Sequence, residues 1–144
     1  MAIDVHSEIL IERPPEKVAE VMFNPKMDKL WIRSLAEVFP MESGFYRQGA
    51  KIERVGDFMS KRYSAKVQVM KCDPGRSVEL YQDEPFEMKQ KYSVREAEGG
   101  TLARVSVSSI GELLFNSPVS ILSKKLKENL DDDLKNLKKL VETG

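Results

Sequence analysis

The sequence is poor in residues that form disulfides or bind transition metals, since it has one cysteine, Cys72, and one histidine, His6. A single cysteine cannot form an internal disulfide, and this usage favours a reducing cytoplasm. One cysteine and one histidine do not make a zinc or copper site. We therefore expect a cytoplasmic chain with no metal and no cofactor.

Neither sign of charge is in excess, because 23 Lys and Arg residues balance 23 Asp and Glu residues. A surface for nucleic acid or anionic membrane would need basic residues in excess on one face. No apolar run approaches a membrane span, and the start MAIDVHSEIL lacks the basic region and apolar block of a signal peptide. The sequence thus predicts no nucleic-acid partner and no membrane span.

The first segment of the chain predicts a strand. At 144 residues the chain has the size of one ordinary domain, which we place at 1–144, and it can bury a core. An apolar or small residue occupies every second position of the first segment, with polar residues between, which is the period of a half-buried strand. These positions are Ile3, Val5, Ser7, Ile9 and Ile11.

The next segment, IERPPEKVAEVMFNPKMDKLW at 11–31, predicts two short helices. Its two adjacent prolines end the strand, and proline is well tolerated in the first turn of a helix. A valine-rich helical face follows at three-to-four spacing, and the third proline ends it. Residues 26–31 fit one more helical turn, which carries the only tryptophan, Trp31.

Six further segments predict strands, because most of them alternate and because Gly, Pro and Asp turn signals separate them. One face is apolar and the other polar, which is typical of an antiparallel sheet covered on one side. Short turns favour hairpin pairing of consecutive strands. We expect a turn at Gly56-Asp57. The expected strands are 35–41, 50–55, 63–72, 77–81, 87–95 and 102–110.

A long amphipathic helix is predicted at the C-terminal end. Asn116-Ser117-Pro118 offers a capping residue followed by a proline in the first turn. We interpret Asp131-Asp132-Asp133 as part of the solvated face, with Asp131 and Lys135 forming a favourable pair four residues apart. The apolar stripe needs a partner, and the sheet is the large apolar surface left to cover. The stripe is Val119, Leu122, Leu126, Leu130, Leu134, Leu137 and Val141.

The order of strand, two short helices, about six antiparallel strands and a long helix resembles the START-like superfamily, also called SRPBCC or helix-grip. Segment 11–31 carries the most specific part of this resemblance, and "DPGRSVEL" and "GGTLARVSV" are similar to the later hairpins. The resemblance covers essentially the whole chain, although its motifs are architectural. It implies an α+β fold in which the long helix packs across the concave face of one curved antiparallel sheet of about six to seven strands.

The resemblance also implies a cavity between sheet and helix. Members of the superfamily bind lipids, sterols, polyketides, quinones or plant hormones there, and some, such as the aromatase/cyclases, catalyse reactions there. We expect a pocket of roughly a few hundred Å³ or more, the usual size for small-molecule sites. The alternative is that leucine and methionine side chains fill this space. The expected ligand-binding residues are Trp31, Ile52, Arg54, Tyr63, Val67, Leu80, Met88, Gln90, Tyr92, Leu122 and Leu126.

Arg54 is the charged residue that strand alternation places on the inward face, because Ala50 and Ile52 share its parity. Its guanidinium either reaches solvent or an acid of a neighbouring strand, or lies on the cavity wall and grips an anionic or carbonyl headgroup. No carboxylate of the strands clearly shares this parity, and His6 falls on the polar face. We therefore expect no catalytic residue.

Three function classes remain open. The first, which we favour, is a carrier or sensor of a hydrophobic small molecule such as a lipid, polyketide or quinone, acting as a monomer or weak dimer. The second is a polyketide cyclase/dehydratase-like enzyme, which would need an inward acid or base. The third is a protein-interaction module similar to the activators of the heat-shock chaperone ATPase, which share the fold and act through outer surfaces.

Overall fold

The fold consists of one antiparallel sheet with a helical layer on its concave side. The computed structural model describes residues 3–40, 43–84, 86–109 and 118–143. None of the helices in this part of the chain is both long and apolar enough to cross a membrane. The elements are β1 (Ile3–Ile11), α1 (Pro15–Met22), the 3-10 turn η1 (Pro25–Met27), α2 (Asp28–Trp31), β2 (Leu35–Pro40), β3 (Lys51–Phe58), β4 (Lys61–Asp73), β5 (Ser77–Gln82), β6 (Met88–Ala97), β7 (Gly100–Ser109) and α3 (Val119–Thr143).

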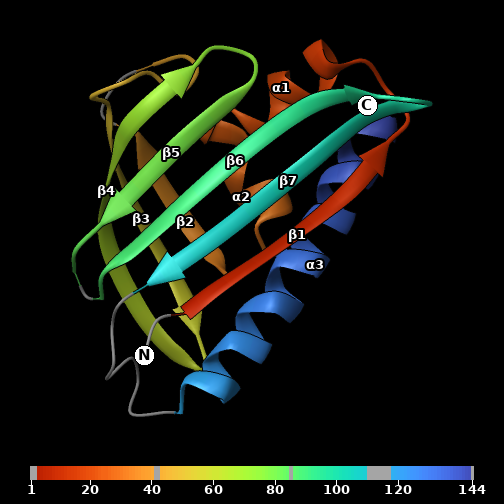
Figure 1. The fold of residues 1–144 in the computed structure, drawn as a ribbon. Coiled ribbons are helices and arrows are strands. Elements are labelled where there is room, and N and C mark those ends of the chain that lie inside the picture. The colour runs from red at the N-terminus through yellow and green to blue at the C-terminus, as the bar shows by residue number, and fades with distance from the viewer. Residues whose placement is uncertain (1–2, 41–42, 85, 110–117, 144) are drawn as a thin grey trace.

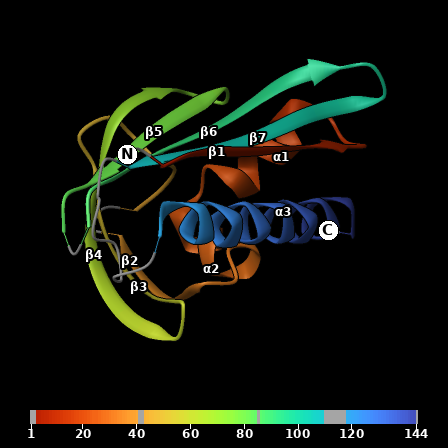
Figure 2. The same cartoon turned by 60° about the horizontal axis from the view of Figure 1, so that its bottom comes forward.

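Seven antiparallel strands form the sheet in the order β1-β7-β6-β5-β4-β3-β2. Consecutive strands pair from β2 to β7, whereas β1 and β2 lie at opposite edges (Figure 1). The chain crosses between these edges through α1, η1 and α2, which therefore lie on the concave side. Figure 2 shows the sheet curving around α3. The predicted helix-grip architecture is confirmed.

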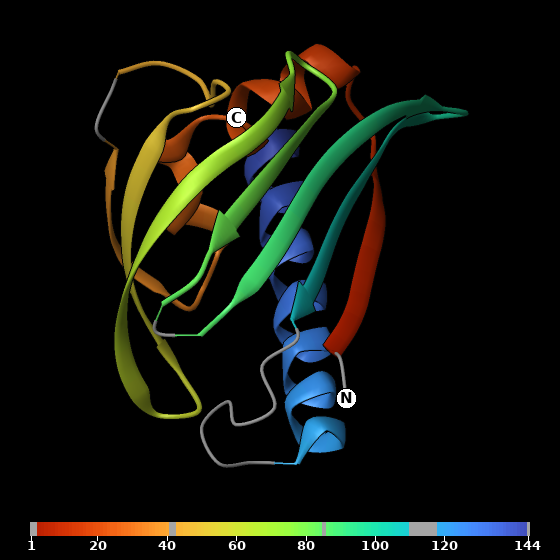
Figure 3. The same cartoon turned by 60° about the vertical axis from the view of Figure 1, so that its left-hand side comes forward.

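Helix α3 runs along the concave face and packs against β1, β7, α1 and α2 (Figure 3). Its predicted apolar stripe provides the contact, because five members are buried: Leu122, Leu130, Leu134, Leu137 and Val141. Leu126 is half-buried. The predicted capping residues Asn116 and Ser117 lie outside the described residues. The long helix therefore covers the sheet as its periodicity predicts.

The predicted turn at Gly56-Asp57 is wrong, because β3 continues to Phe58. A Cβ atom at Gly56 would lie 2.5 Å from the backbone oxygen of Ser34, so this glycine permits a close approach inside the strand. The chain turns at Met59 and Ser60, whose φ angles of 51° and 67° suit a tight hairpin. A glycine beside an aspartate signals a turn in sequence, and only the packing distinguishes the two roles.

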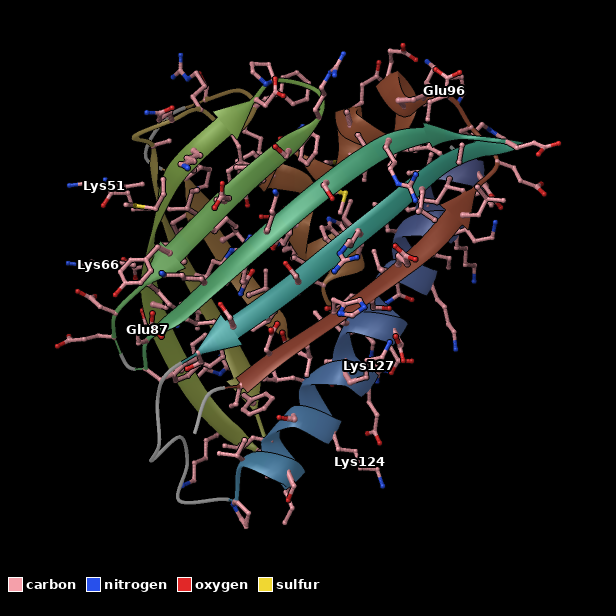
Figure 4. The ribbon with its side chains drawn as sticks, viewed as in Figure 1. Lys51, Lys66, Glu87, Glu96, Lys124 and Lys127 are labelled. Carbon is pink, nitrogen blue, oxygen red and sulfur yellow. The ribbon has the colours of Figure 1, made fainter. Side chains whose placement is uncertain are left out.

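Charged side chains cover the outside of the molecule (Figure 4). Lys51 and Lys66 point away from β3 and β4, and Lys124 and Lys127 point away from α3. Lys127 donates to Asp131 at 2.8 Å, whereas Lys135, the predicted partner, acts on Asp131 through longer-range attraction. The same Asp131 accepts a hydrogen bond from Ser7 of β1.

Candidate ligand-binding cavity

A cavity lies between α3 and the concave face of the sheet. About 70 Å³ of its space is open to the centre of a water-sized molecule. Its walls come from the α2–β2 segment, from β3, β4, β6 and β7, and from α3. The cavity is smaller than the expected few hundred Å³, because large side chains such as Trp31 and Leu130 fill part of the concave face.

Seven of the eleven predicted ligand-binding residues lie on the cavity wall, and four do not. Ile52, Val67 and Leu80 are buried in the main core away from the cavity, and Leu122 packs with Ile3 and Phe58 in a second cluster. Strand alternation predicts which face a side chain occupies, but not its place along that face. The seven on the wall are Trp31, Arg54, Tyr63, Met88, Gln90, Tyr92 and Leu126.

Arg54 occupies the centre of a buried hydrogen-bond network. It is 4% exposed, and its Nη2 donates to Asp28 Oδ2 at 2.8 Å, to Tyr46 Oη at 2.7 Å and to Tyr92 Oη at 3.1 Å. Its Nη1 donates to Gln90 Oε1 at 3.3 Å, and Tyr92 donates to the same oxygen at 3.0 Å. The guanidinium is therefore held in place by residues of three other segments of the chain, namely α2, the β2–β3 connection and β6.

Asp28 of α2 neutralises Arg54. It is completely buried, and the Tyr46 hydroxyl also donates to its Oδ2. Burial raises the pKa of Asp28 to about 6, against the lowering effect of Arg54 and of the Tyr46 hydrogen bond. Burial also raises the pKa of Tyr46. At neutral pH Asp28 and Arg54 consequently form an ion pair of no net charge.

Asp133 of α3 is the second buried carboxyl group and lies on the cavity wall. It is 6% exposed, and its Oδ1 accepts the backbone N–H of Arg33 at 3.1 Å. The Arg33 guanidinium donates instead to the exposed neighbour Asp132, at 3.3 Å. Burial raises the pKa of Asp133 to about 7, although the Arg33 N–H lowers it. The interpretation of Asp133 as a solvated residue is wrong.

The polarity of the cavity wall changes from one end to the other. Arg54 and Phe58 lie four residues apart on β3, and Asp133 and Leu126 lie seven apart on α3. Both spacings correspond to roughly 10–13 Å. Phe58, Leu126 and the adjacent Phe86 belong to one apolar cluster. The cavity is thus charged and polar at one end and apolar at the other.

Comparison of the sequence with protein-family models and with curated proteins finds no match. Solved structures match over nearly the whole length of both chains. A START superfamily protein from Mycobacterium smegmatis has a TM-score of 0.80 at 14% identity, with 97% of each chain covered. The KanY protein has 0.77 at 18% identity with 99% of each chain covered, and Ara h 8.0201 has 0.72 at 14% with 100% covered. The chain has the START-like, helix-grip fold.

Three polar residues of this site escaped prediction, namely Asp28, Tyr46 and Asp133. Strand parity identifies inward-facing residues in strands alone, and none of the three belongs to a strand. Asp133 follows Leu126 by seven residues and Leu130 by three, so helical spacing could have placed it on the buried stripe. Asp28 precedes Trp31 by three residues in the same way. Tyr46 lies in a connection between strands, where no period exists to guide a prediction.

No group of three or more His, Cys, Asp or Glu side chains in the described ranges has an arrangement that could hold a metal ion. The polar atoms available to a ligand are therefore hydrogen-bonding groups. Trp31 Nε1, Asp28 Oδ1 and Arg54 Nε are buried and have no hydrogen-bond partner among the described residues. Since Trp31 and Arg54 line the cavity, a donor is available there without breaking an existing bond.

Proposed function

We propose that the protein binds a small molecule with an apolar body and one polar end in the cavity between the sheet and α3. The observation that carries this proposal is the division of the wall between an apolar end at Phe58 and Phe86 and a polar end at Arg54, Gln90 and Asp133. Small-molecule sites are mostly apolar, with a few converging polar groups that fix orientation. The protein acts as a carrier or sensor of this molecule.

The small volume of the cavity limits the size of the ligand. An engineered apolar cavity of about 150 Å³ in another protein holds one benzene molecule. The 70 Å³ available here is about half of that volume, so a ligand of the size of 1-hexanol fits only if side chains of the wall adjust. A lipid, polyketide or quinone would need far more space than this cavity offers, so we propose a short ligand.

The binding experiment uses 1-hexanol, a slim neutral probe. A ligand that binds the folded state raises the melting temperature by mass action. We expect a saturable rise with the parent protein and a reduced rise with Leu126→Phe, which adds volume at the cavity wall. Ile121→Phe is the matched control, because Ile121 lies on the same helix and is 51% exposed. No saturable rise in the parent, or equal rises in the two variants, would contradict cavity binding.

A second candidate function, proton-transfer catalysis, is favoured by Asp133. An enzyme of the cyclase/dehydratase type needs an acid–base group on the cavity wall, and Asp133 lies there with a pKa raised by burial to about 7. The test measures exchange of the α-hydrogens of 2-hexanone into deuterated water by NMR. Faster exchange with the parent than with Asp133→Asn supports catalysis. Equal rates for the two proteins, at the rate in buffer, would exclude it for this substrate class.

A further inference from the structure

The charges around the cavity do not balance when its acidic groups are ionised. Two of the side chains that line it are charged, Arg54 and Asp133. Arg54 is already paired with Asp28, at 2.8 Å, and the pair is buried on all sides. With all three groups ionised, one arginine faces two carboxylates, and the surplus is one negative charge.

That surplus lies on Asp133. Its Oδ1 accepts one backbone N–H, and a carboxylate can accept several further hydrogen bonds. The guanidinium of Arg33, whose backbone N–H binds Asp133, is hydrogen-bonded to Asp132 at the surface. A buried carboxylate without a cationic partner is costly, and it is relieved either by a proton or by a cation.

Aromatic rings make up much of the remaining wall, and they favour a cation as well. The faces of aromatic rings attract positive charge. Trp31 and Tyr92 stand edge to face with ring centroids 5.5 Å apart, and Tyr63 and Phe86 do so at 5.7 Å. The aromatic residues of the wall are Trp31, Phe58, Tyr63, Phe86 and Tyr92.

We propose that the cavity selects a slim primary alkylamine, whose ammonium group pairs with Asp133 while its chain extends towards Phe58 and Phe86. This inference rests on the proposed small-molecule binding and names the class of ligand. It also reverses the expectation that Arg54 grips an anionic headgroup. An anion would have to displace Asp28 from Arg54 and would meet the Asp133 carboxylate.

The proposal predicts a pH dependence of definite sign. The groups that act on Asp133 or lie close to it are Arg33 from the α2–β2 segment, Arg54 from β3, Tyr63 from β4, Tyr92 from β6 and Asp132 from its own helix. The tyrosines have raised pKa values through burial and stay neutral. An ammonium ion needs the ionised carboxylate, so amine affinity should rise with pH through about 7 and then level off. A neutral ligand that accepts a hydrogen bond from protonated Asp133 would show the opposite dependence.

The test compares hexylamine, 1-hexanol and hexanoate by the fluorescence of Trp31, the single tryptophan, which lines the cavity. An alkylamine stays protonated below about pH 9, because its pKa resembles that of lysine. At pH 8 we expect the amine to bind at least tenfold more tightly than the alcohol, and hexanoate to bind most weakly. At pH 5.5 the preference for the amine should shrink severalfold.

Two variants separate the role of Asp133 from that of overall charge. Asp133→Asn should abolish the preference for the amine and keep the binding of 1-hexanol. Glu128→Gln removes the same charge from an exposed position of the same helix and should leave the preference intact. If Asp133→Asn does not fold, Asp133→Ser takes its place, because Asp28, whose pKa is about 6, also titrates over this pH range and the pH dependence of the parent alone does not single out Asp133.

The possible failures are distinguishable. Equal or tighter binding of 1-hexanol or hexanoate by the parent at pH 8 would overturn the amine proposal and leave the proposed binding function standing. An amine preference that survives Asp133→Asn, or that does not change with pH, would also overturn it. Absence of binding by all three probes would remove the proposed function and this inference with it.

Discussion

The guanidinium of Arg54 pairs with an acid, and this acid is Asp28 of α2. One prediction from the sequence was that Arg54 pairs instead with an acid of a neighbouring strand. The same guanidinium also lines the cavity, as the other expectation stated. Strand alternation shows the direction of a side chain and says nothing of the helices above it. It therefore could not show that Arg54 does both at once. A buried ion pair holds α2, β3 and Tyr46 together and fixes the polar end of the cavity.

Removing Arg54 should therefore destabilise the fold. Arg54→Met leaves Asp28 buried without its cation, and we expect a loss of about 3–5 kcal/mol in the free energy of unfolding. The double variant with Asp28→Asn should lose less than the sum of the single variants, because the two residues are coupled. Urea denaturation measures all three.

Arg62→Met provides the matched control, since Arg62 pairs with Asp57 at the same distance of 2.8 Å but at the surface. Exposed pairs contribute little to stability. A comparable loss for Arg62→Met and Arg54→Met would show that the burial of the Arg54 pair does not matter. Strict additivity of the two cluster substitutions would contradict the coupling.

The raised pKa of Asp133 has a consequence for stability. A carboxyl whose folded-state pKa, here about 7, lies above its ordinary value of 3.8 holds its proton more tightly when folded. It stabilises the fold fully below pH 3.8, and this contribution disappears as the pH rises through about 7. Asp133→Asn should remove this dependence and stabilise the protein above pH 7 by roughly 1–3 kcal/mol.

The measurement is the difference in free energy of unfolding between the parent and Asp133→Asn at several pH values from 4 to 8. Taking a difference cancels the contributions of other titrating groups, such as Asp131. Hydrogen bonds from Lys127 and Ser7 lower the pKa of that carboxyl. A difference that stays constant across this range would show that Asp133 is as acidic as an exposed carboxyl.

At the scale of elements, α3 shows what periodicity predicts well and what it misses. Steps of three and four identified the buried leucines, because burial of one stripe is the main requirement on such a helix. The same periodicity does not predict the burial of Asp133, because a polar residue on a buried face departs from the apolar pattern. The extent of β3 was missed similarly, because Gly56 serves a close contact with Ser34.

The packing of α3 is tested by Leu137→Ala. Leu137 is fully buried in the main core, and truncation of such a leucine costs about 2–5 kcal/mol in the free energy of unfolding. Ile121→Ala on the exposed face of the same helix should change it by less than about 0.5 kcal/mol. Similar losses at the two positions would contradict the packing of the helix across the sheet.

For the whole molecule, the sequence predicted the layers and the order of the elements but not the free volume between them. Alternation and helical spacing indicate which residues are buried, so they predict a sheet covered by a helix. The volume of a cavity depends on how rotamers of Trp31, Leu130 and their neighbours fill the space, which no period encodes. The convergence of Asp28, Tyr46, Arg54 and Asp133 depends likewise on the crossing of α2 and α3 over the sheet.

Intermolecular nuclear Overhauser effects between 1-hexanol and the protein test the central claim most directly, because they locate the bound molecule. The account predicts contacts from the alkyl chain to Trp31, Met88 and Leu126, which line the cavity. Met70 provides the contrast, since it is exposed and belongs to a groove on the opposite face of the sheet, with Lys89 and Lys91. Contacts confined to Met70 and other exposed residues, or no contacts at all, would contradict the binding of a small molecule between the sheet and α3.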